Sequence, residues 1–237
     1  MIAVAGLTKR FGDLAAVDDL SFTGAAGQVM AVLGPNGAGK TTTFRVLLGL
    51  ARPTAGRALI DGRPYAELER PRQTVGAVLE SSGFHPARTG RDHLRVVARA
   101  AGIPRSRVDE LLEFVGLARA GDRRVGGYST GMRQRLAVAG ALLGDPRVIV
   151  LDEPTSGLDP EGVAWMRHLL REFAAEGRCV LVASHLLAEV AQVADRVVII
   201  ARGRALREAD VASLDGATAL EQLYLSLAGR GEEREVA

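Results

Sequence analysis

The apolar positions of the chain fall into short runs separated by glycine- and proline-rich turns. Residues 28–33, QVMAVL, form one such run; a glycine-rich loop follows it, and then TTTFRVLLGL, whose apolar residues recur at helical spacing. This order predicts a strand, a loop and a helix. The stretches between the β-type runs are mostly helix-like, an alternation typical of a mainly parallel sheet with helices on both faces. The further β-type runs lie at 57–60, 75–79, 148–151, 179–184 and 196–200.

The β-type runs are absent between about residues 85 and 145. Three segments there carry apolar residues at helical spacing, separated by turns, and read HLRVVARAAG, RVDELLEFVGL and GMRQRLAVAGALLG. We therefore expect an inserted helical subdomain. In the first 27 residues, AGLTKRFGD and LSFTGAAG predict short antiparallel strands at the edge of the sheet. The last stretch, GRGEEREVA, is expected to be flexible.

The composition is that of an ordinary globular protein. Of the 237 residues, 47% are hydrophobic and 24% are charged, which suits one sizeable α/β domain with a smaller inserted part. The 30 basic and 28 acidic residues leave a net charge of only +2, which is weak support for nucleic-acid binding. We therefore expect no nucleic-acid partner.

Cys179 is the only cysteine, so an intrachain disulfide cannot form. It lies in CVLVAS, a pattern that predicts a buried strand in which the thiol acts as a small apolar group. A reducing cytosol is the expected compartment. The sequence has no run of about 18 apolar residues, and the N-terminus, MIAVAGLTKRF, lacks a charged leader. We expect the chain neither to cross a membrane nor to be secreted.

The loop after the first predicted strand carries the strongest chemical signal. It reads GPNGAGKT from Gly34 to Thr41, which is the spacing of a phosphate-binding loop in its required strand–loop–helix context. Its glycines let successive N–H groups converge on a phosphate, Lys40 reaches the β and γ oxygens, and the Thr41 hydroxyl ligates Mg²⁺. A turn that binds no ligand would explain the glycines but not the Lys–Thr pair. We predict ATP and Mg²⁺ as the ligands.

An acidic pair follows a second apolar run. VIVLDEP places Asp152 and Glu153 where a strand of the parallel sheet ends, on the same side as the phosphate loop. Asp152 is expected to hold Mg²⁺ through water, and Glu153 to orient and deprotonate the attacking water. A helix-capping acidic pair is the alternative reading.

The segment YSTGMRQRLAVAGALL at 128–143 resembles the signature motif of ABC-transporter ATPase subunits. Further elements follow in the family's order: SGLDP at 156–160 resembles the D-loop, His185 resembles the switch histidine, and Phe11 resembles the adenine-stacking aromatic. The resemblance covers roughly residues 2–207. It implies an α/β fold with a phosphate-loop NTPase (RecA-like) core, an antiparallel β edge and the helical subdomain. An ATP-binding domain at 1–207 would be followed by a C-terminal helix and flexible tail at 208–237.

The resemblance also implies that one chain holds only half of each site. In the family, the residues that correspond to Ser129 and Gly131 donate hydrogen bonds to the γ-phosphate of an ATP held by another subunit, so two chains, expected to be identical, close over two ATP molecules. His185 would steady the γ-phosphate and the attacking water. The implied nucleotide contacts are Phe11, Gly34, Pro35, Asn36, Gly37, Ala38, Gly39, Lys40, Thr41, Thr42, Ser129, Gly131 and Asp159.

Two positions depart from the family's common pattern. Thr130 stands where the signature usually has glycine, and Glu80, in VGAVLESSGFHP, stands where the Q-loop has glutamine. Glutamate there resembles the exporters that confer resistance to bacitracin and lantibiotic peptides. We expect Glu80 to act as a metal ligand and coupling residue, and a solvated carboxylate at a strand end is the alternative. ALEQLYLSLAG at 219–229 resembles the terminal helix of antibiotic-type export subunits, although an amphipathic surface helix explains it equally well.

The expected function is that of the ATP-hydrolysing subunit of an exporter for a drug, antibiotic or peptide. Its permease would be a separate membrane protein, and the chain would sit on the inner face of the cell membrane through that permease. One rival is a soluble ABC-type ATPase of translation or DNA repair, but those usually have two such domains or a long coiled-coil insertion. A second rival, a phosphate-loop kinase, would not need the signature or His185.

Overall fold

The computed structural model describes residues 1–79, 83–214 and 216–233. The chain divides into two compact units. The first unit comprises Met1–Leu68 and Arg167–Ala237, and the second comprises Glu69–Met166. The boundary at residue 166 falls within helix α6 (Pro160–Ala175). The expected α/β fold is confirmed, because both units combine helices with parallel strands.

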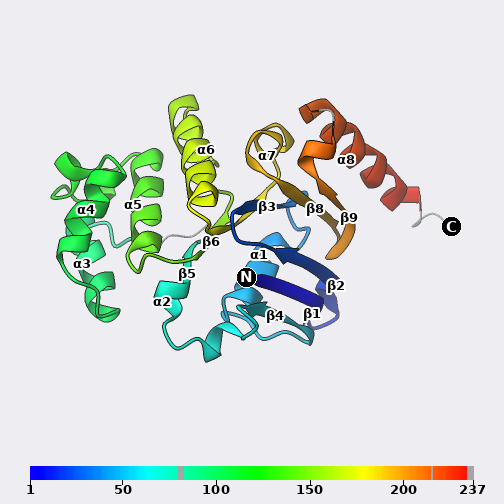
Figure 1. The fold of residues 1–237 in the computed structure, drawn as a ribbon, viewed down its shortest axis with the longest axis horizontal. Helices are drawn as coiled ribbons and strands as arrows, with labels where there is room; N and C mark the ends of the chain where they lie inside the picture. The colour runs from blue at the N-terminus through cyan, green and yellow to red at the C-terminus, as the bar shows by residue number, and fades with distance from the viewer. Residues whose placement is uncertain (80–82, 215, 234–237) are drawn as a thin grey trace. The chain divides into compact units, whose positions relative to one another are not determined.

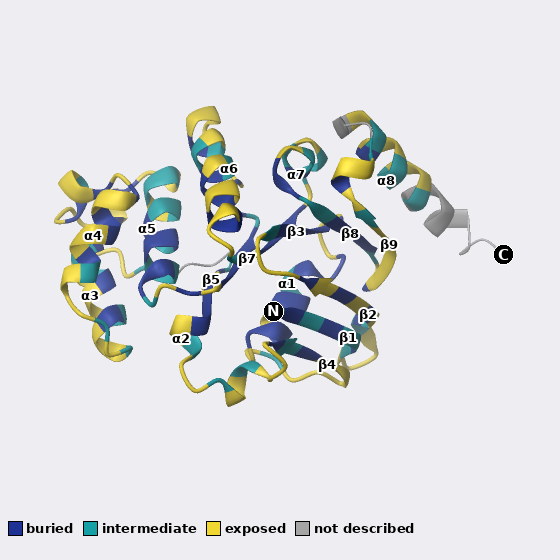
Figure 2. Ribbon diagram, viewed as in Figure 1, coloured by how far each residue is buried: buried dark blue, intermediate teal, exposed yellow. Residues whose placement is uncertain are grey.

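Four strands of the first unit lie in the order β7-β3-β8-β9, and β3 leads into the phosphate loop. Strand β3 (Gln28–Leu33) runs parallel to β7 (Cys179–Ser184) on one side and to β8 (Arg196–Ala201) on the other. Apolar residues are buried along the length of β3 and β7, as parallel strands covered on both faces require (Figure 2). The strands predicted at 28–33, 179–184 and 196–200 are confirmed.

Strand β9 (Arg204–Asp210) pairs antiparallel with β8 and was not predicted. Its residues are almost all exposed, so it has no apolar run by which the sequence would mark a strand.

A separate three-stranded antiparallel sheet, in the order β2-β1-β4, completes the β structure of the first unit (Figure 1). The antiparallel strands predicted at the N-terminus are β1 (Ile2–Phe11) and β2 (Leu14–Gly24). Strand β4 (Ala55–Ile60) pairs with β1, so the run at 57–60 does not join the parallel strands. Only Ala58 and Ile60 of β4 are buried, and a strand with one solvated face suits an antiparallel sheet.

The helices of the first unit are α1 (Lys40–Leu47), the end of α6, α7 (Leu187–Val193) and α8 (Gly216–Glu233), with short 3₁₀ turns at Tyr65–Glu67 and Val211–Ser213. Helix α8 packs on α7. It contains the helix expected at 219–229 and continues to Glu233, so the predicted flexible stretch begins within a helix. Residues 234–237 lie outside the described residues.

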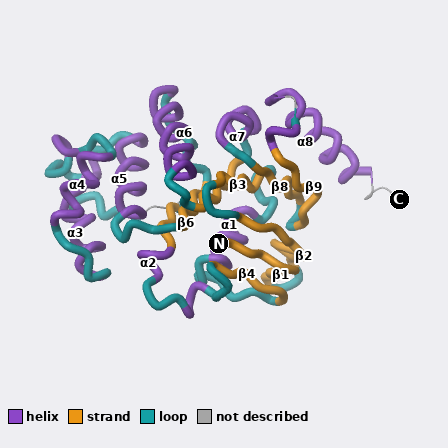
Figure 3. The backbone as a smooth tube through the Cα atoms, viewed as in Figure 1, coloured by secondary structure: helices purple, strands orange, loops and turns teal. Residues whose placement is uncertain are grey.

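The second unit contains the three helices expected between 85 and 145, which pack on one another (Figure 3). They are α3 (Gly90–Ala100), α4 (Ser106–Phe114) and α5 (Thr130–Leu142), and they bury Leu94, Leu112 and Leu136. Strands β5 (Val75–Val78) and β6 (Val148–Asp152) pair in parallel. The remaining elements are α2 (Pro71–Thr74) and 3₁₀ turns at Ala118–Ala120 and Val125–Gly127.

Candidate functional site

The phosphate loop of the first unit connects buried strand β3 to helix α1. No side chain caps the N-terminus of α1, and its first turn contains no acidic residue. The N–H groups of a first helical turn have no partner within the helix and carry partial positive charge. The loop therefore presents uncapped amides of the kind that bind a phosphate.

Two positions in this loop accept only glycine. The backbone of Gly39 has φ +103°, and an added Cβ would lie 2.4 Å from the carbonyl oxygen of Ala16 in β2. At Gly34, an added Cβ would lie 2.4 Å from the carbonyl oxygen of Ile200 in β8. Real Cβ atoms do not approach backbone oxygens so closely, so the path of the loop depends on these glycines.

Lys40 is 5% exposed and its ammonium group is bound by the loop itself. Nζ donates to the carbonyl oxygens of Gly34, at 2.7 Å, and Pro35, at 3.2 Å. These two hydrogen bonds hold the ammonium group against the loop that is predicted to bind phosphate. Behind it, the Thr43 hydroxyl donates to the Gly39 carbonyl oxygen at 2.9 Å, which fixes the start of the helix.

The phosphate loop and His185 directly follow the carboxyl ends of two adjacent parallel strands. Leu33 and Ser184 are register partners in β3 and β7, and the Gly34 amide donates to the Ser184 carbonyl oxygen at 3.3 Å. His185, the next residue, is exposed. The structure therefore brings the predicted switch histidine to the sheet edge at which the loop starts.

Phe11 ends β1 at the hairpin to β2, and its side chain is 54% exposed. The Lys9 ammonium group lies 4.7 Å from the centre of its ring, a distance typical of a cation–π contact. Ala16, in β2 just after this hairpin, lies close to Gly39 of the phosphate loop. The exposed Phe11 ring is therefore on a hairpin beside that loop. Nothing in the sequence context of Lys9 predicts this cation–π contact.

In the second unit, the acidic pair sits at the end of β6. Asp152 is 2% exposed, and Glu153 follows it with φ +48°, in the left-handed region. For a residue other than glycine this conformation costs about 1–3 kcal/mol. Asp152 Oδ1 and Glu153 Oε1 are buried and accept no hydrogen bond, although neither residue is without a partner.

The signature residues of the second unit stand at the N-terminus of α5. Ser129 caps the helix, and its Oγ accepts from the Met132 amide at 3.2 Å, which leaves the hydroxyl proton available to a ligand. Gly131 is open: the nearest atom to an added Cβ, on Leu158, is 3.9 Å away. The N-cap reading and the anion-site reading of Ser129 are thus compatible.

Tyr128 anchors the segment before the helix. Its hydroxyl donates to the Ala120 carbonyl oxygen at 2.6 Å, and burial raises the pKa of this phenol. Arg133 donates to the Tyr128 carbonyl oxygen at 2.8 Å. These contacts fix the position at which Ser129 begins the helix.

The D-loop of the same unit packs against the signature. An added Cβ at Gly157, where φ is +71°, would lie 3.4 Å from Cγ2 of Thr130. The side chain that Thr130 adds to the signature therefore lies beside Gly157, which has no side chain. Asp159 caps α6 with Oδ1, which accepts from the Gly162 amide at 2.8 Å, so its nucleotide contact stays a prediction beside this structural role.

The predicted site residues therefore divide between the units. Phe11, His185 and the loop from Gly34 to Thr42 belong to the first unit. Ser129, Gly131, Asp152, Glu153 and Asp159 belong to the second. Glu80 lies outside the described residues.

Each unit contains an oxygen donor of the kind that Mg²⁺ prefers. Mg²⁺ is usually held by one or two carboxylates plus substrate phosphates. The first unit has the Thr41 hydroxyl at the start of α1, and the second has the buried carboxylate of Asp152 at the end of β6. Within the described ranges, no group of three or more His, Cys, Asp or Glu side chains could hold a metal alone.

The sequence is similar to a known protein family and to individual proteins of known name. The family model described as ABC transporter matches residues 17–156. The bacitracin transport ATP-binding protein BcrA of Bacillus licheniformis is 41% identical over 211 residues, which cover 88% of this chain and 69% of that protein. The Nod factor export ATP-binding protein I of Burkholderia lata is 43% identical over 205 residues, which cover 84% of this chain and 67% of that protein.

A solved structure gives the same result for the fold. The chain superposes on an ATP binding subunit of an ABC transporter with a TM-score of 0.85 at 27% identity, covering 96% of this chain and 99% of that one. In the part of the chain that the structure describes, no helix has the length and apolar composition needed to span a bilayer.

Proposed function

We propose that this chain, which belongs to the ABC transporter family, is the ATP-hydrolysing subunit of an exporter for a drug, antibiotic or peptide. The observation that carries the proposal is the phosphate loop, whose uncapped helix N-terminus and buried Lys40 form an anion site. The name of one relative, for Nod factor export, supports outward transport, and that of another, for bacitracin transport, supports an antibiotic as the cargo.

ATP binds this chain through the loop from Gly34 to Thr42. The first-turn amides of α1 and the Lys40 ammonium group contact the phosphates, and the exposed Phe11 ring stacks on the base. Thr41 and Asp152 would hold Mg²⁺, which would neutralise phosphate charge. Both supply oxygen donors, and the Asp152 carboxylate is buried.

Glu153 is the proposed general base. Its backbone has φ +48° in the turn after β6, and its Oε1 is buried. A carboxylate that orients water and accepts its proton is the simplest role for an acidic residue at the end of this strand. His185 would steady the γ-phosphate and the attacking water from the end of β7.

The site is completed by a second copy of the chain. Ser129 and Gly131 are accessible at the N-terminus of α5, where helix amides add to the serine hydroxyl as anion ligands. We propose that these groups reach the γ-phosphate of ATP on the partner, so that ATP drives formation of a homodimer.

A separate membrane permease is the second partner, and it places the chain on the inner face of the cell membrane. Closure and reopening of the dimer would move cytosolic segments of the permease. Glu80 is proposed, from sequence alone, as a metal-side and coupling residue. If so, Glu80→Gln and Glu80→Ala change the Mg²⁺ dependence of ATP hydrolysis; unchanged kinetics in both variants argue against the role.

Fractionation tests the proposal against the rival of a soluble ABC-type ATPase. An exporter subunit sediments with membranes and is released by detergent together with a hydrophobic, multi-spanning protein. Loss of the chain then sensitises cells to the exported compound. Recovery of the chain with ribosomes or DNA supports the rival, and so does its recovery in the supernatant, apart from membranes, ribosomes and DNA. Phosphorylated metabolite formed in place of free phosphate supports a kinase.

A further inference from the structure

A pocket of about 590 Å³ lies in the second unit, along α3 and the turn that leads from α3 to α4. Most of its lining is cationic or apolar. Three arginines line it together with two apolar residues and one acidic residue, namely Arg95, Arg99, Arg105, Val96, Ile103 and Asp92. Small-molecule sites occupy about 300–1,000 Å³, so the pocket has room for a compact ligand.

The acidic residue of this lining is already engaged at the start of α3. Oδ2 of Asp92 accepts from the Thr89 hydroxyl at 2.8 Å, and Oδ1 pairs with Arg95 at 3.3 Å. The Asp92 amide donates to the Thr89 hydroxyl at 3.0 Å, so the same residue takes part in the N-terminal cap of the helix. Asp92 therefore offsets the charge of Arg95 and not that of the other two arginines.

Arg99 and Arg105 are exposed, and neither forms an ion pair with any residue that the structure describes. Arg91, two turns before Arg99 on the same helix, shows the contrast, because it pairs with both Asp109 and Asp122. The pocket therefore presents two guanidinium groups whose charges no neighbouring carboxylate offsets.

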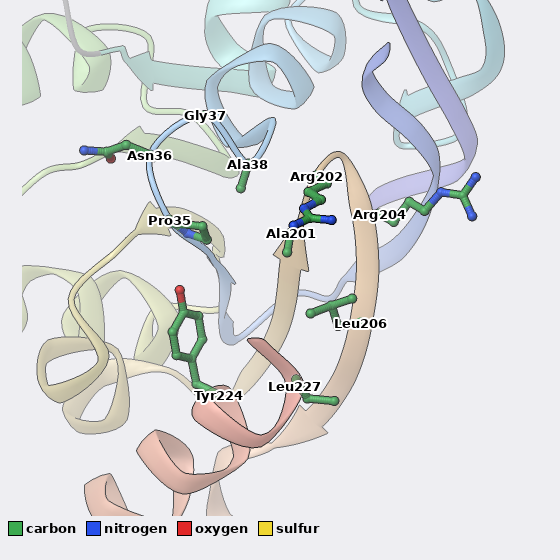
Figure 4. Close-up of a pocket in the computed structure, with 10 residues that line it drawn as sticks. All are labelled: Pro35, Asn36, Gly37, Ala38, Ala201, Arg202, Arg204, Leu206, Tyr224 and Leu227. Carbon is green, nitrogen blue, oxygen red and sulfur yellow. The ribbon is translucent and has the colours of Figure 1, made fainter. Parts of the chain in front are cut away.

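A second pocket, of about 350 Å³ beside the phosphate loop of the first unit, differs in this respect (Figure 4). Its lining also includes two arginines, but Arg204 extends toward β2, where its guanidinium pairs with Asp18 at 2.6 Å. Arg202 likewise has an interaction partner. The arginines of that pocket are engaged by the chain itself, so they do not indicate an anionic ligand.

The arginines of the pocket in the second unit are unfavourably placed when no anion is bound. Arg95 and Arg99 are four residues apart on α3, and like charges at this spacing destabilise a helix. Arg105 is the N-cap of α4, where the helix dipole repels a cation. The last turn of α3 suits Arg99 by the same rule, but it does not offset the charge of Arg105. A bound anion would reduce both repulsions.

We propose that this pocket binds a phosphate ester. The phosphate group lies between Arg99 and Arg105, and the organic part packs on Val96, which is 51% exposed, and on Ile103. The planar fork of a guanidinium group matches two oxygens of a phosphate, and a phosphate has enough oxygens for two such groups. A soluble phosphate ester and the headgroup of an anionic phospholipid share this chemistry. None of the predicted nucleotide contacts lines the pocket, so the proposal does not depend on the transport function.

The test uses the full chain, with a non-hydrolysable ATP analogue and Mg²⁺ at saturation to keep the probes from the phosphate loop. Phenyl phosphate, titrated by calorimetry, is the soluble probe, and phenol is its uncharged counterpart. Sedimentation with phosphatidylcholine vesicles, with and without phosphatidic acid, tests the lipid source. Arg99→Gln and Arg105→Gln are compared with Arg119→Gln, an exposed arginine of the same unit that does not line the pocket. Circular dichroism checks that each variant is folded.

We expect saturable binding of one phenyl phosphate per chain, or sedimentation that requires phosphatidic acid. Arg99→Gln and Arg105→Gln each raise the Kd roughly tenfold, the scale of one charge-assisted contact, and Arg119→Gln leaves it unchanged. Binding of phenyl phosphate shows that a soluble ester is sufficient, whereas binding of the acidic vesicles alone identifies the lipid headgroup.

Three results would overturn the proposal. The first is that the chain binds neither phenyl phosphate nor the acidic vesicles. The second is that phenol binds as tightly as phenyl phosphate. The third is that Arg119→Gln weakens binding as much as the two pocket variants, which is the result expected when surface arginines act only through their net charge.

Discussion

The Gly34 amide donates a hydrogen bond to the carbonyl oxygen of Ser184, at 3.3 Å. This bond joins the first residue of the phosphate loop to the residue before His185. Because β3 and β7 are buried parallel strands in register, the start of the loop and the histidine are held by the sheet and not by a flexible connection. The position of His185 should therefore change little when nucleotide binds.

The loop glycines should differ in how well they tolerate alanine. Gly37 has φ +80° but nothing within 4 Å of an added Cβ, whereas at Gly39 the Cβ would lie 2.4 Å from the Ala16 carbonyl oxygen. Gly37→Ala should lower the free energy of unfolding by about 1–2 kcal/mol, the cost of a left-handed conformation. Gly39→Ala should cost clearly more. Urea unfolding of the nucleotide-free chain measures both, and equal losses would contradict the loop geometry.

Lys40→Ala should weaken ATP binding itself. It removes a cation whose hydrogen bonds to phosphate are worth about 1.5–3 kcal/mol, so the Kd should rise roughly ten- to a hundredfold. Arg45→Ala, an exposed cation of the same helix, is the matched control. Titration with a fluorescent ATP analogue measures the Kd. An unchanged Kd in Lys40→Ala would remove the lysine from the phosphate site.

Gly131→Ala should weaken dimer formation and leave the folding of the monomer unchanged. An added Cβ meets nothing closer than 3.9 Å within the chain, so the monomer should remain as stable as before. The same methyl group would stand where the partner's γ-phosphate is proposed to bind, so ATP-dependent dimerisation should weaken. Gly140→Ala, on the same helix with its nearest atom at 3.7 Å, is the control. Light scattering with and without ATP reports the mass, and undiminished dimer in Gly131→Ala contradicts the shared site.

Cys179 should be inert in the folded chain. Burial raises the pKa of its thiol from 9.0 to about 11, so at pH 8 its thiolate fraction is about a hundred times smaller than that of an exposed thiol. Reaction with a disulfide reagent should require unfolding. The unfolded chain also loses this proton at lower pH than the folded chain, so the free energy of unfolding should fall as pH rises from about 9 toward 11. Rapid labelling of native protein at pH 8 would contradict this.

The elements that the sequence predicts are those with continuous apolar runs or strict motif spacing. Strand β3 and its loop belong to this class, because burial on both faces leaves an unbroken apolar run that ends in GPNGAGKT. Strand β9 could not be found in this way, since its residues are almost all exposed. The pairing of β4 with β1 depends on long-range contacts that a local pattern does not carry.

The candidate site likewise has features that motif spacing predicts and features that it does not. Motif spacing identifies Lys40 and Glu153 by type and position. It does not report that Lys40 is bound to the Gly34 carbonyl oxygen, that Glu153 has a positive φ, or that Gly203 bonds to Ala38. The first two are details of local geometry, and the third joins segments far apart in the sequence. None of them follows from residue type and spacing, so each needed the structure.

The most direct test of the account compares ATP binding with ATP turnover in Glu153→Gln. The amide keeps the size of the side chain and the backbone at φ +48°, and removes only the base. Glu161→Gln, an exposed glutamate in the first turn of α6, is the control. We predict that Glu153→Gln retains the Kd for ATP and loses roughly 10²- to 10⁴-fold in turnover, the scale of a positioned general base. Full turnover in Glu153→Gln would contradict the assignment of the catalytic site.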